Sequence, residues 1–284
     1  MPASTLDIDH LRGWIGRQEV LHDTITAFPV AALAATLDRD DAEPLAGDAL
    51  PPLWHWLYFL PRARQSQLGP DGHPARGGFL PPVKLPRRMW AGGRLEFPGT
   101  LRVGDAVTRT STVADVSRKE GRTGPLVFVL VRHEIAGPEG VAVTEEHDIV
   151  YRGLPGPGEP TPAPRLAPEA TAWRRDIVPD EVLLFRYSAL TFNGHRIHYD
   201  RRYVTQQEGY PGLIVHGPLL ATLLVDLLRR NTDRRLAGFR FRAASPVFDT
   251  APFAVCGRPE GGRVTLWARK ADGTLAMDAE ASLD

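Results

Sequence analysis

The chain has 284 residues, of which 43% are hydrophobic and 24% are charged. Such a chain is long and apolar enough to fold as one large globular domain or two smaller ones, which excludes a small stapled scaffold and a disordered protein. Lys plus Arg and Asp plus Glu both number 34, so the formal net charge is zero. No overall field therefore favours nucleic acid or an anionic membrane as a partner.

The cellular setting follows from the cysteine content and from the absence of long apolar runs. Cys256 is the single cysteine, which excludes an internal disulfide and fits a reducing compartment. No window reaches the roughly 18 apolar residues of a membrane span, and the start of the chain has no apolar stretch of signal-peptide length. We therefore expect a cytoplasmic protein without a membrane partner.

The first half of the chain predicts helices followed by strands. Helices are expected over residues 7–21, 28–37 and 52–60, and the last of these is short, aromatic and bounded by prolines. Strand-like runs then cover residues 94–97, 106–116, 126–135 and 141–151. Turn signals rich in glycine and proline separate these runs.

A linker is expected next, because residues 153–168 contain six prolines and three glycines. It would divide an N-terminal unit, 1–152, from a C-terminal unit, 169–284. The second unit has a polar segment at 191–207 and then an aliphatic helix, with Gly217 as the predicted N-cap and Pro218 at the first helical position. Its predicted strands follow the helix, at residues 236–243, 253–257, 263–269 and 275–281.

Leucines lie on nearly every face of the helix that starts at Gly217, so it should be buried almost all round. A buried helix followed by several short strands occurs in both halves. This order predicts an α+β fold in which an antiparallel sheet wraps a central helix, twice over.

Two segments carry a family resemblance. Residues 187–200, YSALTFNGHRIHYD, resemble the signature of MaoC-like (R)-specific enoyl-CoA hydratases, in which an acid stands five positions before a His. Residues 213–218, LIVHGP, resemble the start of the central helix in their hot-dog fold. Together with 77–93 and 124–134, these segments resemble the branch related to mitochondrial type 2 hydroxyacyl-thioester dehydratases and mesaconyl-C4-CoA hydratases.

The resemblance implies a double hot-dog whose C-terminal unit keeps the catalytic residues and whose N-terminal unit has lost them. It also implies a hydro-lyase that adds or removes water across the α,β double bond of an acyl-CoA thioester. CoA then enters as part of the substrate, and no metal or redox cofactor is expected. A homodimer is a further expectation from the family.

The catalytic candidates are His198, Asn193 and Gly217. His198 matches the catalytic His of the family and titrates near neutral pH, so it can move the proton. Asn193 stands where the family commonly has Asp, and an amide can orient water but cannot take up a proton. Gly217 would offer a backbone N–H to the developing enolate oxygen, and its missing Cβ would allow close approach.

Further residues are candidates for substrate binding, each with a plainer alternative. His195 lies within the first motif and His216 within the second, Trp54 and Trp56 could wall an acyl channel, and Arg87 and Arg88 could meet phosphate or a second carboxylate. A structural cap would explain His216 equally, core packing would explain His55 between the tryptophans, and solvated surface charge would explain the arginines. The His195 and His198 spacing suggests a metal, but no further ligands complete a site.

The substrate favoured by the resemblance is a short branched dicarboxylic enoyl-CoA, such as mesaconyl-C4-CoA or itaconyl-CoA. Three alternatives stay open. They are a (3R)-hydroxyacyl-thioester dehydratase of fatty-acid synthesis, a hot-dog thioesterase, and a thioester-binding protein without catalysis.

Overall fold

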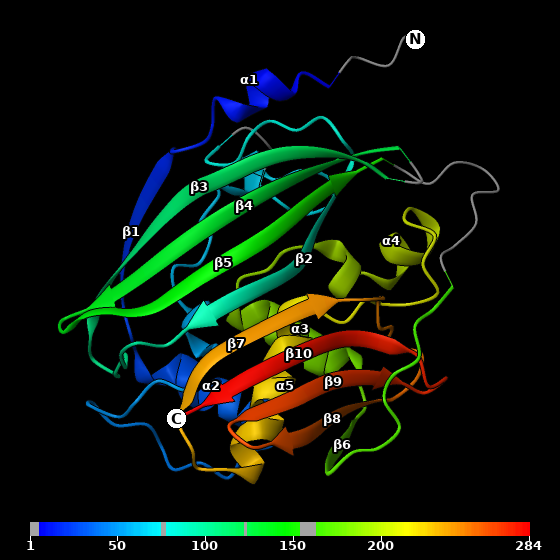
Figure 1. The fold of residues 1–284 in the computed structure, drawn as a ribbon. Coiled ribbons are helices and arrows are strands. Elements are labelled where there is room, and N and C mark those ends of the chain that lie inside the picture. The colour runs from blue at the N-terminus through cyan, green and yellow to red at the C-terminus, as the bar shows by residue number, and fades with distance from the viewer. Residues whose placement is uncertain (1–5, 75–77, 122–123, 154–162) are drawn as a thin grey trace.

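The computed structural model describes residues 6–74, 78–121, 124–153 and 163–284. Its strands form one ten-stranded antiparallel sheet in the order β1-β3-β4-β5-β2-β7-β10-β9-β8-β6 (Figure 1). The strands are β1 (Gln18–Thr24), β2 (Arg87–Glu96), β3 (Ala106–Gly121), β4 (Gly124–Gly137), β5 (Gly140–Arg152), β6 (Trp173–Ile177), β7 (Leu236–Ala243), β8 (Phe253–Glu260), β9 (Arg263–Lys270) and β10 (Leu275–Leu283).

The helices lie on one side of this sheet, apart from α1 at its upper edge (Figure 1). They are α1 (Ile8–Arg12), α2 (Ala27–Thr36), α3 (Glu181–Leu190), α4 (Arg201–Gln206) and α5 (Gly217–Asn231), with 3-10 turns η1 (Trp54–Leu57), η2 (Gln65–Gln67) and η3 (Arg196–His198). No helix within the described ranges is long and apolar enough to cross a membrane.

The two halves of the sheet repeat one strand order. In chain order, β1 to β5 of the first half match β6 to β10 of the second, and each half places its second strand at the centre of the sheet. There β2 pairs with β7, from Gly92 opposite Arg242 to Glu96 opposite Gly238. This repeat is the double hot-dog architecture that the sequence predicts. Residues 154–162, which hold most of the predicted linker, lie outside the described residues.

The central helix α5 forms because its side chains are apolar on every face. Each residue from 219 to 228 is buried, including Thr222 and Asp226. The prediction of a buried helix from Gly217 is confirmed, with one correction. His216 is the N-cap and Gly217 is the first helical residue, because Pro218 fits the early helix where no N–H is needed.

The equivalent helix of the first half is reduced to the single turn η1. A helix over 52–60 was expected, but Leu53, directly before the turn, and Phe59, two residues after it, have positive φ angles that a helix cannot continue through. As a result, the inner face of the first half of the sheet has no long helix on it. The double hot-dog is therefore asymmetric, and this asymmetry leaves room for a cavity.

Four other expectations need correction. The helix predicted over 7–21 ends at Arg12, because the chain turns at Gly13 and Gly16, and Gln18–Thr24 pairs with β3 as an edge strand. The strand β6 and the helix α3 were not predicted. Strand β2 begins at residue 87, seven residues before the expected start at residue 94. Polar surface side chains mask these elements, since only one face of each is buried.

Candidate active site

A cavity of about 1350 Å³ lies between the two halves of the chain. The first half contributes η1, residues from 61–74 and 78–81, β2 and β5, and the second contributes α3, the turn after it and the start of α5. Aromatic side chains form much of its wall, among them Trp56, Trp90, Tyr187 and Phe192. No Asp or Glu of the described residues lines it, whereas Arg88, Arg196, His73 and His147 do.

The end of α3 presents Asn193 to this cavity. Phe192 adopts a left-handed conformation with φ 47°, which turns the chain sharply after the helix. The Asn193 N–H then donates to Ser188 O at 2.8 Å, and Asn193 Oδ1 accepts from the His195 N–H at 3.0 Å. Nδ2 of Asn193 donates to none of the described residues, so the amide can hydrogen-bond to a ligand.

His198 lies behind Asn193, in the turn η3. Its Nδ1–H donates to Ile214 O at 2.7 Å, which fixes the tautomer and leaves Nε2 as an acceptor. Burial lowers the pKa of His198 to about 4, despite the favourable bond to Ile214. The ring keeps 7% exposure and does not itself line the cavity. At neutral pH this imidazole is therefore an uncharged base.

The tip of α5 meets the same group of histidines. The His216 ring stacks on His198 with centroids 3.7 Å apart, and His216 Nε2 is hydrogen-bonded to Ser188 Oγ at 2.8 Å. Burial lowers the pKa of His216, so this ring is also neutral. Gly217 follows directly, and a Cβ placed on it would meet no atom within 4 Å. Its N–H belongs to the first helical turn, where backbone donors lack intrahelical acceptors.

Asp200 has a structural role, although it is near His198 in the sequence. It caps α4 by accepting from the Tyr203 N–H at 2.9 Å, and it accepts from Arg196 at 2.8 Å. These bonds occupy the carboxylate, so it does not replace the acid that position 193 lacks. The backbone bond from the Asp200 N–H to Arg196 O and these side-chain bonds hold the motif in one conformation instead.

A loop from the first half approaches the motif closely. The His73 ring lies 3.9 Å from the His195 ring, and Asp71 Oδ2 accepts from His73 Nδ1–H at 3.2 Å. One ligand atom from each of Asp71, His73 and His195 lies within 4.8 Å of the others, a spacing that could also hold a metal ion. The sequence does not reveal this cluster, because over a hundred residues separate its two parts.

The opposite wall is held by a buried carboxylate that sequence reasoning also missed. Glu145 accepts from His55 Nε2–H at 3.0 Å, from Trp56 Nε1–H at 2.9 Å and from His147 Nε2–H. Burial favours the neutral acid, but the two histidines outweigh it and hold the pKa of Glu145 well below its usual range. Trp56 and His147 both line the cavity, so Glu145 fixes two of its wall residues.

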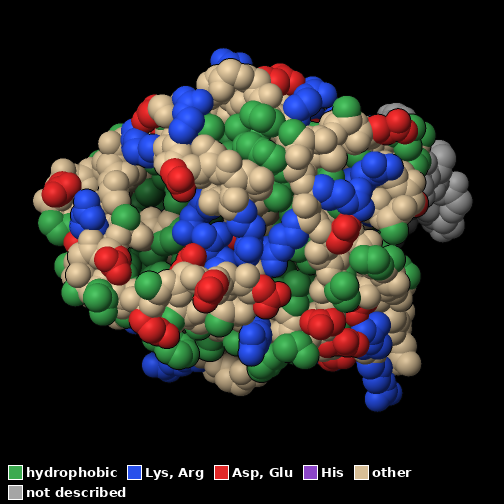
Figure 2. Space-filling model, turned by 90° about the horizontal axis from the view of Figure 1, so that it is seen from below, with side chains coloured by type: hydrophobic (Ala, Val, Ile, Leu, Met, Phe, Trp, Pro, Cys, Tyr) green, Lys and Arg blue, Asp and Glu red, His purple; other side chains and the backbone are tan. Residues whose placement is uncertain are grey.

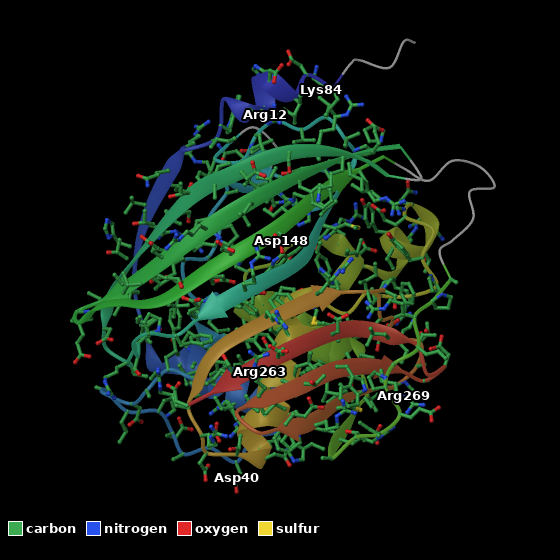
Figure 3. The ribbon with its side chains drawn as sticks, in the orientation of Figure 1. Arg12, Asp40, Lys84, Asp148, Arg263 and Arg269 are labelled. Carbon is green, nitrogen blue, oxygen red and sulfur yellow. The ribbon has the colours of Figure 1, made fainter. Side chains whose placement is uncertain are left out.

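Strand β5 alternates between the two faces of the sheet, which explains why Glu145 is buried. Its neighbours Glu146 and Asp148 pair with Arg94 on the outer face, where Figure 3 labels Asp148. Because successive side chains of a strand point to opposite faces, Glu145 and His147 point inward.

The remaining predicted residues divide between the cavity and its surroundings. Asn193, Trp56 and Arg88 line the cavity, and no described residue pairs with the Arg88 guanidinium. Trp54, predicted to wall the acyl channel, is instead 2% exposed in the core, and Arg87, also predicted to bind substrate, lies over the Tyr210 ring outside the cavity lining. Four predicted residues do not line the cavity and lie behind the residues that do: His195, His198, His216 and Gly217.

A second cavity, of about 380 Å³, opens at the other end of α5. Figure 2 shows Lys and Arg side chains gathered on this underside of the molecule. Arg39, Arg229, Arg234 and Arg235 line the cavity. Arg39 pairs with Asp226 at 2.8 Å and Arg235 pairs with Asp284, so much of this charge is neutralised within the protein.

Comparison with known proteins places this site in a class. The structure resembles the crystal structure of a MaoC-like dehydratase from Phytophthora capsici, with a TM-score of 0.70, 17% identity and coverage of 98% and 99% of the two chains. It also resembles a Mycobacterium tuberculosis protein described as having a double hotdog fold, with a TM-score of 0.58, 13% identity and coverage of 95% and 96%. The fold is therefore a double hot-dog, as the sequence predicts.

The family follows from the sequence comparisons. Residues 53–249 match the family described as hydroxyacyl-thioester dehydratase type 2. The chain is 52% identical over 273 residues to a protein named mesaconyl-C(4)-CoA hydratase from Chloroflexus aurantiacus, covering 95% of this chain and 96% of that one. It is 26% identical over 272 residues to the mitochondrial hydroxyacyl-thioester dehydratase type 2 of Schizosaccharomyces pombe, covering 84% and 89%.

The chain belongs to the hydroxyacyl-thioester dehydratase type 2 family. It is a hydro-lyase of the MaoC-like type, which confirms the predicted family and reaction class.

Proposed function

We propose that this enzyme hydrates a short branched dicarboxylic enoyl-CoA, with mesaconyl-C4-CoA as the first candidate. The observation that carries the proposal is the 52% identity, over almost the whole length of both chains, to the Chloroflexus protein of that name. The composition of the cavity supports it. Among the described residues of the wall there is no Asp or Glu, and Arg88 is present, which suits an acyl chain with a negative charge.

His198 is the proposed base in this reaction. Its Nε2 takes a proton from water while the water oxygen bonds to the β-carbon, and the π electrons move toward the thioester oxygen. The N–H groups at the tip of α5, beginning with Gly217, stabilise the resulting enolate oxygen. Asn193 orients the water through its unoccupied Nδ2. The enolate then takes a proton at the α-carbon to give the hydroxyacyl thioester.

Three further proposals concern the organisation of the enzyme. We assign the reaction to the C-terminal unit, 169–284, and much of the acyl cavity to the N-terminal unit, 1–152. We propose a homodimer, since Phe28, Val182 and Phe185 expose apolar surface on the adjacent helices α2 and α3. A cytoplasmic location is consistent with the single buried thiol of Cys256.

The test compares hydration of mesaconyl-C4-CoA with hydration of crotonyl-CoA by the purified protein, followed by loss of enoyl-thioester absorbance. We expect kcat/KM to be at least about 100-fold higher for the dicarboxylic substrate, a difference of about 2.7 kcal/mol in transition-state binding. A preference for the uncharged chain would replace this proposal with the (3R)-hydroxyacyl-thioester dehydratase. Release of free thiol would indicate a thioesterase.

A further inference from the structure

The catalytic motif lacks a carboxylate at Asn193, and the first half of the chain brings one to the same place. Asp71 and His73 belong to the loop after η2, which lies against residues 193–198. The Arg196 N–H donates to Asp71 O at 2.9 Å, and Arg196 Nη1 donates to Pro70 O at 2.9 Å. Two hydrogen bonds from the motif itself therefore hold this loop.

A backbone contact between the loop and the motif also fixes the position of the loop. Gly72 has φ 87°, and a Cβ built on it would lie 1.9 Å from Gly194 O. Only glycine fits there, because a side chain would overlap the backbone of the motif. The loop and the motif thus meet in a single register, with His73 next to His195.

The Asp71 carboxylate fixes the orientation of the His73 ring. Asp71 Oδ1 accepts from the His73 N–H at 3.1 Å, and Asp71 Oδ2 accepts from Nδ1–H at 3.2 Å. Nε2 of His73 then has no hydrogen-bond partner in the part of the chain that the structure describes, and His73 lines the cavity. A carboxylate thus holds one nitrogen of an imidazole that lines the cavity, and no described residue occupies the other nitrogen.

We propose that His73 is a second catalytic residue, which delivers the α-proton, and that Asp71 is its positioning residue. The inference rests on the proposed hydration reaction. An amide at position 193 cannot serve as the proton donor. The inference assigns that role to a pair made of a carboxylate and an imidazole from the N-terminal unit. His198, buried and neutral, is the base, and His73, beside a carboxylate, is the acid.

The proton and electron balance of this step closes without a cofactor. His198 Nε2 gains one proton from water, and the hydroxyl oxygen forms its bond to the β-carbon. The imidazolium of His73 gives its Nε2 proton to the α-carbon as the enolate electron pair forms the new C–H bond. Solvent in the cavity returns the proton from His198 to His73, so the sum is addition of one water.

The surroundings of His73 determine how its charge responds to pH. The titratable or charged groups near it are Asp71 on its own loop, His195, Arg196 and His198 on the motif, and Arg88 on β2. Asp71 is the one carboxylate of this set, and its hydrogen bond with His73 holds the pKa of Asp71 below its usual range.

The test uses His73→Gln and Asp71→Asn in the full-length protein, with the exposed His22→Gln on β1 as the matched control. We expect His73→Gln to lower kcat by about 100-fold or more with KM changed less than about threefold, as for loss of a general acid. The decline of kcat/KM at high pH, which reports deprotonation of the donor, should disappear in His73→Gln. It should move to lower pH in Asp71→Asn, and His22→Gln should match the wild type.

Three outcomes would overturn the inference. They are a raised KM with normal kcat in His73→Gln, an unchanged pH profile, or loss of wild-type activity on treatment with EDTA that Zn²⁺ restores, which would make the cluster a metal site. Should His73→Gln not fold, His73→Ala assayed with added imidazole provides the second measurement, and failure of imidazole to rescue it counts against the proposal. A wild type that hydrates only crotonyl-CoA would refute the substrate and leave this test intact on that thioester.

Discussion

Replacing Glu145 with Gln tests the buried carboxylate that holds Trp56 and His147 in the wall of the cavity. The carboxylate is 3% exposed and accepts three N–H donors, two of them from histidines. A hydrogen bond to a charged group contributes about 1.5–3 kcal/mol. The Gln oxygen can still accept from Trp56 and His147, but the bond from His55 is lost, so we expect the free energy of unfolding to fall by about 3 kcal/mol.

The assays are thermal and guanidinium unfolding, together with substrate kinetics. At about 2–4 °C per kcal/mol, the melting temperature of Glu145→Gln should fall by about 6–12 °C. Because Trp56 and His147 then bond to a neutral amide in place of a carboxylate, they are held less firmly, and KM for the enoyl-CoA should rise with a smaller change in kcat. The control is Glu120→Gln, whose carboxylate is 65% exposed beside Arg118 and should change stability by less than about 0.5 kcal/mol.

The pH dependence gives the same prediction a second check. The pKa of Glu145 is lower in the folded protein than its ordinary value of 4.5, so its contribution is fully present above that value. The contribution is lost as the pH falls through the folded pKa, and the stability gap between wild type and Glu145→Gln should narrow with it. A loss below about 1 kcal/mol at pH 7, or a gap independent of acid pH, would refute the reasoning.

The remaining predictions concern the reaction. His198→Gln should lower kcat by about 10²–10⁴-fold. On the acid side of its pH profile, the wild-type kcat/KM should fall near pH 4, because burial lowers the pKa of His198 to about 4 and the base must be neutral; an acid-side fall near pH 6.5 would contradict this. Asn193→Asp should keep at least about a tenth of the activity if the amide only orients water, and a large gain in kcat would refute that role. Arg88→Gln should raise KM about tenfold for mesaconyl-C4-CoA but not for crotonyl-CoA; equal losses would place Arg88 at the CoA phosphates instead.

The sequence determined the features that depend on neighbouring residues. The leucines after Gly217 and Pro218 specify a buried helix and its start, because burial on every face needs only local composition. The spacing of Asn193 and His198 identified the motif, and with it the family. Proline and glycine content likewise marked most boundaries between strands.

Only the tertiary structure decided which partners complete the site. Asp71 and His73 meet His195 because the backbone contact of Gly72 with Gly194 fixes one register between segments far apart in the chain. Glu145 reaches His55 because β5 turns alternate side chains inward beneath η1. The helix expected over 52–60 is shortened to the single turn η1 because Leu53 and Phe59 adopt left-handed conformations. This shortening opens the cavity. Nothing in their local sequence demands that conformation; packing against the rest of the chain selects it.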